Sequence, residues 1–205
     1  MNDDINKSNI ISFFKNVIDD KIQKDAIGDL KYTKEFLSLG VPNFRTASLI
    51  DEQLHKVSDA EFKKAGLDVA ALDFSVLDFD ITLTADNVRH IYRKHGKYGT
   101  SDSTMSNDSA YILIQDVLQS PDSIVVSRTT RTINSETEEY ILDLDYSSPS
   151  SYSNGRFSIK LELNKIIDGY CFVLIMVVHV SMKVVHEPMK NKQLKIITAY
   201  KKKIK

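Results

Sequence analysis

A short segment, residues 89–95, concentrates side chains that can transfer protons and bind anions. It reads Arg-His-Ile-Tyr-Arg-Lys-His, so two histidines lie among three cations and a tyrosine. Imidazole titrates near neutral pH, and guanidinium and ammonium groups bind phosphate through charge-assisted hydrogen bonds. The composition therefore indicates acid–base chemistry on a phosphate-containing molecule, with His90 and His95 as titrating groups and Arg93 and Lys94 among the cations.

The spacing of the two histidines limits how they can act. His90 and His95 are five residues apart. On an α-helix this is about 500° of rotation, so the rings point about 140° apart and only one can face a common site. A helical zinc pair needs a spacing of four residues, which excludes one here. Each histidine also has a simpler interpretation, His95 as a cation at the helix end and His90 as a solvated surface residue.

The sequence predicts no metal and no cofactor. Cys171 is the only cysteine, which excludes a cysteine-based zinc site, and its apolar neighbours predict an inert core thiol. Asp143 and Asp145 lie two residues apart on a predicted strand and are most simply a solvated face. His179, among valines, is expected to be structural, and His186, at a strand end, is expected to be exposed.

The elements that position these residues change character near residue 80. Thr84 can cap a helix that runs to His95, with Gly96 at its C-terminal end, and a polar loop over residues 97–107 follows. The apolar spacing of residues 110–118 predicts a second helix. Beyond it, segments rich in Ile, Val, Thr and Tyr predict strands. The predicted strands are residues 123–132, 139–145, 156–163, 170–185 and 193–200.

The first part of the chain has the pattern of helices. Ile10, Phe14 and Ile18 recur at four-residue steps, as on one face of an amphipathic helix. A short helix is expected over residues 30–39, and another from the capping box that begins at Ser58. No catalytic cluster occurs in this part, and its role is unknown.

Together the two parts predict an α+β fold. A helical N-terminal region, residues 1–78, precedes a domain, residues 79–205, in which two helices pack on a mostly antiparallel β-sheet. The formal net charge is −1, but residues 1–80 carry 15 acidic and 10 basic side chains, whereas residues 81–205 carry 13 and 17. This asymmetry predicts an anionic partner for the second part. A solvated lysine tail is the alternative for the basic end of the chain.

The sequence predicts no export or membrane segment. The start, Met-Asn-Asp-Asp, lacks the positive charge and apolar run of a secretion signal. The longest apolar stretch, residues 171–178, is far too short to span a bilayer as a helix. We therefore expect neither a signal peptide nor a transmembrane segment, and a cytoplasmic site of action.

Three blocks of the sequence carry a resemblance to a known superfamily. Residues 84–95 contain the pattern His-Ile-x-x-x-His, residues 111–124 end in Pro-Asp-x-Ile, and residues 195–200 read Lys-Ile-Ile-Thr-Ala-Tyr. In this order they resemble the first helix, the second helix with its exit into a strand, and the closing strand of phage-associated nuclease domains in the barnase–EndoU–colicin–RelE (BECR) superfamily. The blocks cover about residues 80–201.

The resemblance implies a metal-independent endoribonuclease toxin of the kind used in bacterial competition. Such an enzyme cleaves RNA by attack of the 2′-OH and leaves 2′,3′-cyclic phosphate and 5′-OH ends. The implied substrate is RNA, with tRNA among the candidate targets, and the implied partner is an immunity or antitoxin protein. The alternative is a non-catalytic phage-associated module that binds RNA or protein. The implied catalytic residues are His90, His95, Thr198 and Tyr200, and the implied substrate-binding residues are Arg93 and Lys94.

The closing strand adds a geometric expectation. Thr198 and Tyr200 are two residues apart on a predicted strand, so their side chains share a face. If that face looks towards the first helix, the two hydroxyls meet the surface that carries His90 and Lys94, and a phosphate can lie between them. The alternative is that Tyr200 packs at a sheet edge and Thr198 serves β propensity.

Overall fold

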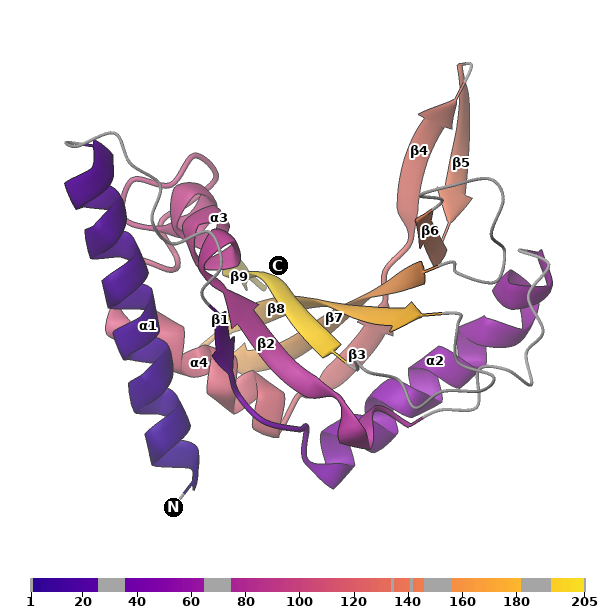
Figure 1. The fold of residues 1–205 in the computed structure, drawn as a ribbon, viewed down its shortest axis with the longest axis horizontal. Helices are drawn as coiled ribbons and strands as arrows, with labels where there is room; N and C mark the ends of the chain where they lie inside the picture. Colours follow the sequence, from indigo (N-terminus) through magenta and orange to yellow (C-terminus); the bar gives the residue numbers. More distant parts are fainter. Residues whose placement is uncertain are drawn as a thin grey trace.

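A computed structural model of the chain describes residues 2–25, 36–64, 75–133, 135–140, 142–145, 156–181 and 193–204. Figure 1 shows a central β-sheet with helices around it. The helices in the described residues are α1 (Asn2–Asp25), α2 (Phe44–Lys64), the short 3₁₀ helix η2 (Val76–Asp78), α3 (Ala85–His95) and α4 (Asp108–Gln119). The strands are β1 (Phe36–Ser38), β2 (Asp80–Thr84), β3 (Ser123–Val126), β4 (Thr129–Ile133), β5 (Glu136–Tyr140), β6 (Leu142–Asp145), β7 (Arg156–Ile167), β8 (Tyr170–Ser181) and β9 (Gln193–Lys203).

One mixed sheet organises the fold. Its strands lie in the order β1-β2-β9-β8-β7-β3, and β6 also pairs with β7. β2 and β9 are parallel, with Asp80 opposite Gln193, whereas the other described neighbours are antiparallel. β4 and β5 form a separate hairpin that projects away from the sheet (Figure 1). The expected α+β class with a mostly antiparallel sheet is therefore confirmed.

The N-terminal region differs from the prediction at two places. Residues 36–38 form β1, which pairs with β2, so the helix expected over residues 30–39 is wrong at its end, and residues 30–35 lie outside the described part. Pairing with a distant strand overrides local propensity here. α2 does not begin at Ser58 but directly after Asn43, whose side-chain oxygen accepts a hydrogen bond from Thr46 N at 2.9 Å.

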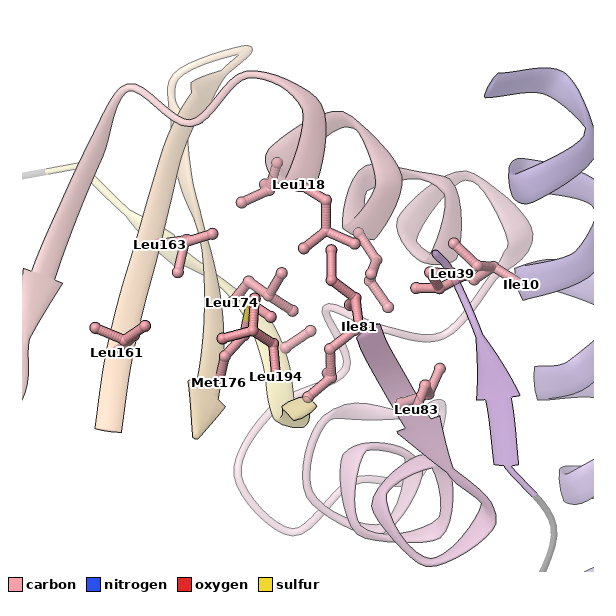
Figure 2. Close-up of a cluster of buried hydrophobic side chains, with 14 of the residues drawn as sticks. Ile10, Leu39, Ile81, Leu83, Leu118, Leu161, Leu163, Leu174, Met176 and Leu194 are labelled. Atoms are coloured by element: carbon pink, nitrogen blue, oxygen red, sulfur yellow. The ribbon is translucent and has the colours of Figure 1, made fainter. Parts of the chain in front are cut away.

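A continuous hydrophobic core joins the N-terminal helices to the sheet. Phe14 of α1 is fully buried, and its ring stacks on Tyr111 of α4 with centroids 4.2 Å apart. Figure 2 shows Leu118 of α4 directed at the sheet side chains around Leu174, with Ile10 of α1 at one end of the same cluster. Each fully buried large apolar side chain contributes about 1.5–3 kcal/mol. Residues on both sides of position 78 thus stabilise one core.

α3 follows β2 directly and packs against β9. Thr84 caps its start, because the threonine hydroxyl accepts a hydrogen bond from Asn87 N at 3.3 Å. At the other end Gly96 N donates to Tyr92 O at 2.8 Å. Both predicted helix ends are therefore confirmed. The apolar side of α3 is buried, so its last turn, with His95, is held beside the sheet.

An irregularity in β9 decides which of its side chains share a face. The register with β8 shifts between Ile196 and Thr198, so Ile197 is an additional residue, a β-bulge. Beyond the bulge, Thr198 and Tyr200 alternate with the buried Ala199. They therefore share one face of the strand, as expected.

Candidate functional site

The C-terminal end of α3 carries a histidine–carboxylate pair. Nδ1 of His95 lies 2.8 Å from Oδ2 of Asp102, and the two side chains are 12% and 33% exposed. Because an ionised carboxylate can only accept, Nδ1 is the donor of this hydrogen bond, and in the neutral ring Nε2 then keeps its lone pair. In the described part of the chain Nε2 has no hydrogen-bond partner. An imidazole oriented in this way can accept a proton from a bound molecule.

The second carboxylate oxygen of Asp102 is held by Thr104. The backbone nitrogen of Thr104 donates to Oδ1 at 3.0 Å and its hydroxyl donates at 2.7 Å. Burial by itself raises the pKa of Asp102, but these hydrogen bonds and the contact with His95 outweigh it, so the pKa lies below its ordinary value. Asp102 is therefore ionised at neutral pH and stabilises positive charge on His95.

Thr104 also joins the loop between α3 and α4 to the sheet. Its hydroxyl oxygen accepts a hydrogen bond from Lys201 N of β9 at 3.1 Å. The pairing of β2 with β9 stops at Ile196, so the backbone of β9 beyond that residue is open to the loop. One threonine thus holds both the carboxylate that orients His95 and the strand beside it.

Tyr200 of β9 stacks on His95. The ring centroids are 4.9 Å apart, and the ring planes are inclined by 19°. The ordinary pKa of tyrosine already keeps the Tyr200 hydroxyl protonated at neutral pH, and burial and then the nearby carboxylate of Glu162 raise that pKa further, so the hydroxyl can donate a hydrogen bond. The structure therefore brings together one predicted site residue from α3 and one from the closing strand.

Within the described residues, the side chains of the other predicted site residues make no hydrogen bond or ion pair with His95 or Asp102. His90 is partly buried, and burial, followed by the charges of Arg93, His95 and Lys94, lowers its pKa. Arg93 is exposed and Lys94 is partly buried. The hydroxyl oxygen of Thr198 is buried and has no hydrogen-bond partner in the described structure.

The path of the loop explains why Asp102 reaches His95. Lys94 O accepts hydrogen bonds from Ser101 N at 2.9 Å and Asp102 N at 3.1 Å, which folds the loop back against the helix end. Gly99 lies where the chain comes closest. A Cβ there would stand 2.2 Å from Asp102 O and 2.5 Å from Lys94 O, so only glycine fits this approach.

Sequence analysis did not identify Asp102 and Thr104, because it treated residues 97–107 only as a polar loop. The available signal was the pattern Asp-x-Thr, in which an aspartate accepts from the backbone N–H two residues later. That pattern marks a turn and not a catalytic carboxylate. The contact with His95 follows from how the loop folds and is not encoded in the spacing alone.

Several remaining expectations concern residues away from the pair. No group of three His, Cys, Asp or Glu side chains among the described residues could hold a metal ion. The described helices include none with the length and apolar character needed to cross a membrane. Cys171 is a free thiol and is partly rather than fully buried. For His179 the structure describes only the backbone, in β8, and His186 lies outside the described residues.

Comparison of the chain with protein-family models, with curated proteins and with solved structures gives no match. The resemblance to the BECR superfamily is therefore carried by the three sequence blocks. The geometry of the His95–Asp102 pair is independent of that resemblance, because Asp102 belongs to none of the blocks.

Proposed function

We propose that the chain is a metal-independent endoribonuclease toxin in which His95 transfers a proton. The observation that carries this proposal is the His95–Asp102 pair with the ring of Tyr200 stacked on the imidazole. RNA contains its own nucleophile, the 2′-OH. The enzyme therefore needs only to remove that proton, stabilise the charge on phosphate and protonate the leaving oxygen.

In the proposed reaction Nε2 of His95 takes the proton of the 2′-OH, because Nδ1 already donates a hydrogen bond to Asp102. The 2′ oxygen bonds to phosphorus and the bond from phosphorus to the 5′ oxygen breaks, which gives 2′,3′-cyclic phosphate and 5′-OH ends. The ionised Asp102 stabilises the imidazolium. Tyr200, whose hydroxyl is protonated at neutral pH, is the candidate donor to the leaving 5′ oxygen. The proton that His95 took from the 2′-OH then passes to the phenolate oxygen of Tyr200, which restores both side chains.

Positive charge near the pair suits a polyanionic substrate. Arg93 and Lys94 lie in the last turn of α3, and three lysines end β9. Such cations neutralise phosphates and attract RNA in a salt-dependent way. A ribonuclease that acts on cellular RNA, with tRNA among its candidate targets, also endangers the cell that makes it, so the proposal includes an immunity or antitoxin protein as partner.

The first prediction is that cleavage depends on His95 and not on histidine content. Total RNA is incubated in EDTA with the parent, His95→Gln, and His55→Gln as a matched control at an exposed histidine of α2. The parent and His55→Gln should cleave at equal rates, whereas His95→Gln should be slower by about two to four orders of magnitude. The new ends should be 2′,3′-cyclic phosphate and 5′-OH, and only active variants should arrest bacterial growth when expressed.

Three outcomes contradict this proposal. Cleavage that EDTA abolishes shows that a metal is needed, and equal cleavage by His95→Gln and the parent places the active site elsewhere. Stable binding of RNA without any cleavage supports the non-catalytic module instead.

A further inference from the structure

Tyr98 lies in the loop between the two members of the His95–Asp102 pair, three residues after the histidine and four before the carboxylate. Its side chain is 81% exposed, more than that of any other large apolar or aromatic residue in the described structure. Single exposed apolar side chains are common on proteins, so exposure alone indicates nothing. The backbone and the charges around Tyr98 provide the argument.

The turn that carries Tyr98 is held at both sides. Gly99 N donates to Gly96 O at 2.9 Å, which closes a four-residue turn with Tyr98 at its tip. Thr100 N then donates to Arg93 O at 3.0 Å and fastens the turn to the end of α3. A ring presented by a fixed turn loses little conformational freedom when a ligand stacks on it.

The sequence around the Tyr98 ring contains positively charged side chains. Nζ of Lys97 lies over one face of Tyr98, 5.4 Å from the ring centroid, which leaves the opposite face for a ligand. Arg93, which lies close to Tyr98 in the sequence, is also exposed. The acidic residue of segment 93–107 is Asp102, and it is engaged with His95. An aromatic face beside cations that make no ion pair within the described residues suits a planar base attached to a phosphate.

We propose that Tyr98 and Lys97 form a base-stacking subsite for an unpaired nucleotide of single-stranded RNA beside the cleaved bond, an inference that rests on the function proposed above. Tyr98 stacks on the base and Lys97 binds the adjacent phosphate. Bases inside a duplex stack on one another and offer no free face to a protein ring. In a flexible single strand the 2′-OH can also rotate to the side of the phosphorus opposite the leaving 5′ oxygen, where it can attack.

The second prediction tests this subsite without cleavage. A 2′-O-methyl oligonucleotide lacks the nucleophile and stays intact, and 2-aminopurine within it loses fluorescence when it stacks. Tyr98→Ala should raise the Kd by about tenfold or more and abolish the quenching, because one base–aromatic stack is lost. Tyr98→Phe should stay within about twofold of the parent, since the ring remains. The matched control is Phe44→Ala, at a side chain that is 73% exposed at the start of α2, and it should leave binding unchanged.

The outcomes separate the subsite from the activity. If the parent cleaves RNA and Tyr98→Ala binds the oligonucleotide as tightly as the parent, the subsite is refuted while the ribonuclease stands. Equal weakening by Tyr98→Phe and Tyr98→Ala also refutes it, because the ring is then not what binds. A duplex of the same sequence should bind independently of Tyr98, and a duplex that depends on Tyr98 as strongly as the single strand overturns the assignment to unpaired nucleotides.

Discussion

His90 and His95 lie on the same helix, yet their surroundings differ in charge. His95 contacts an ionised carboxylate and a tyrosine ring, which orient the imidazole. His90 has neither neighbour, and burial together with nearby cations lowers its pKa, which disfavours its charged form. At the residue scale, Asp102 is thus what makes one of the two histidines suited to proton transfer.

The third prediction concerns Asp102→Asn, which keeps the size of the side chain and removes its charge. An amide can donate to Nδ1 and so stabilise the wrong tautomer of His95, and it no longer stabilises the imidazolium. Single-turnover cleavage should slow by about two orders of magnitude or more, with binding of the 2′-O-methyl oligonucleotide unchanged. Cleavage at the parent rate shows that Asp102 does not orient the catalytic imidazole.

The fourth prediction uses the lowered pKa of Asp102. Because the folded-state pKa lies below the ordinary value of 3.8, the ionised carboxylate adds stability above that pH and loses it as the pH falls through the folded pKa. Asp102→Asn should therefore lower the free energy of unfolding at pH 7 and should flatten its decline below pH 3.8. Denaturant titrations of the parent and of Asp102→Asn at pH 7 and pH 3 measure these free energies of unfolding. If the substitution lowers the free energy of unfolding equally at the two pH values, the lowered pKa of Asp102 is contradicted.

The residues of the site differ in whether the sequence around them could reveal their place in it. The proximity of His95 and Tyr200 could be expected, because one lies on a well-defined helix and the other on the closing strand. Asp102 could not, since its approach depends on backbone hydrogen bonds to Lys94 O and on the missing side chain of Gly99. Neither condition has a recognisable pattern in a single sequence.

At the scale of elements, local signals again decide what can be predicted. α3 and α4 combine capping side chains with an apolar stripe, so caps and periodicity agree. β1 has three residues, too few to show alternation, and its partner Thr82–Thr84 lies more than forty positions away. The strand predicted over residues 123–132 is divided between β3 and β4, which belong to different sheets. Alternation reveals a strand but not its partner.

The fifth prediction tests the link between loop and strand. Thr104→Val keeps the shape of the side chain but removes the hydroxyl that bridges Asp102 and Lys201 N. The loss of a hydrogen bond to a charged group, worth about 1.5–3 kcal/mol, should reduce kcat by about tenfold or more with little change in KM. Thr104→Ser keeps the hydroxyl and should restore most of the rate. If the valine and serine variants are equally active, the bridge does not position the site.

At the scale of the whole molecule, the helical N-terminal region, residues 1–78, shares its packing with residues 79–205. Phe14 of α1 is 0% exposed and stacks on Tyr111, which lies in the same helix as the side chains that cover the sheet. β1 extends the sheet by pairing with β2. The domain boundary near residue 78 remains a prediction. Because these contacts cross it, measurements of unfolding can test whether the residues on its two sides form one cooperative unit.

The last prediction compares two phenylalanines of equal size in different surroundings. Phe14→Ala removes a fully buried ring and leaves a cavity, so it should lower the free energy of unfolding by about 3–5 kcal/mol. Phe44→Ala, at a side chain that is 73% exposed, should change it by less than about 0.5 kcal/mol. Both variants should unfold in one cooperative transition, since α1 and the sheet share a core. A separate early transition in Phe14→Ala, with the second transition at the parent's midpoint, shows instead that α1 is a unit distinct from the domain that carries His95.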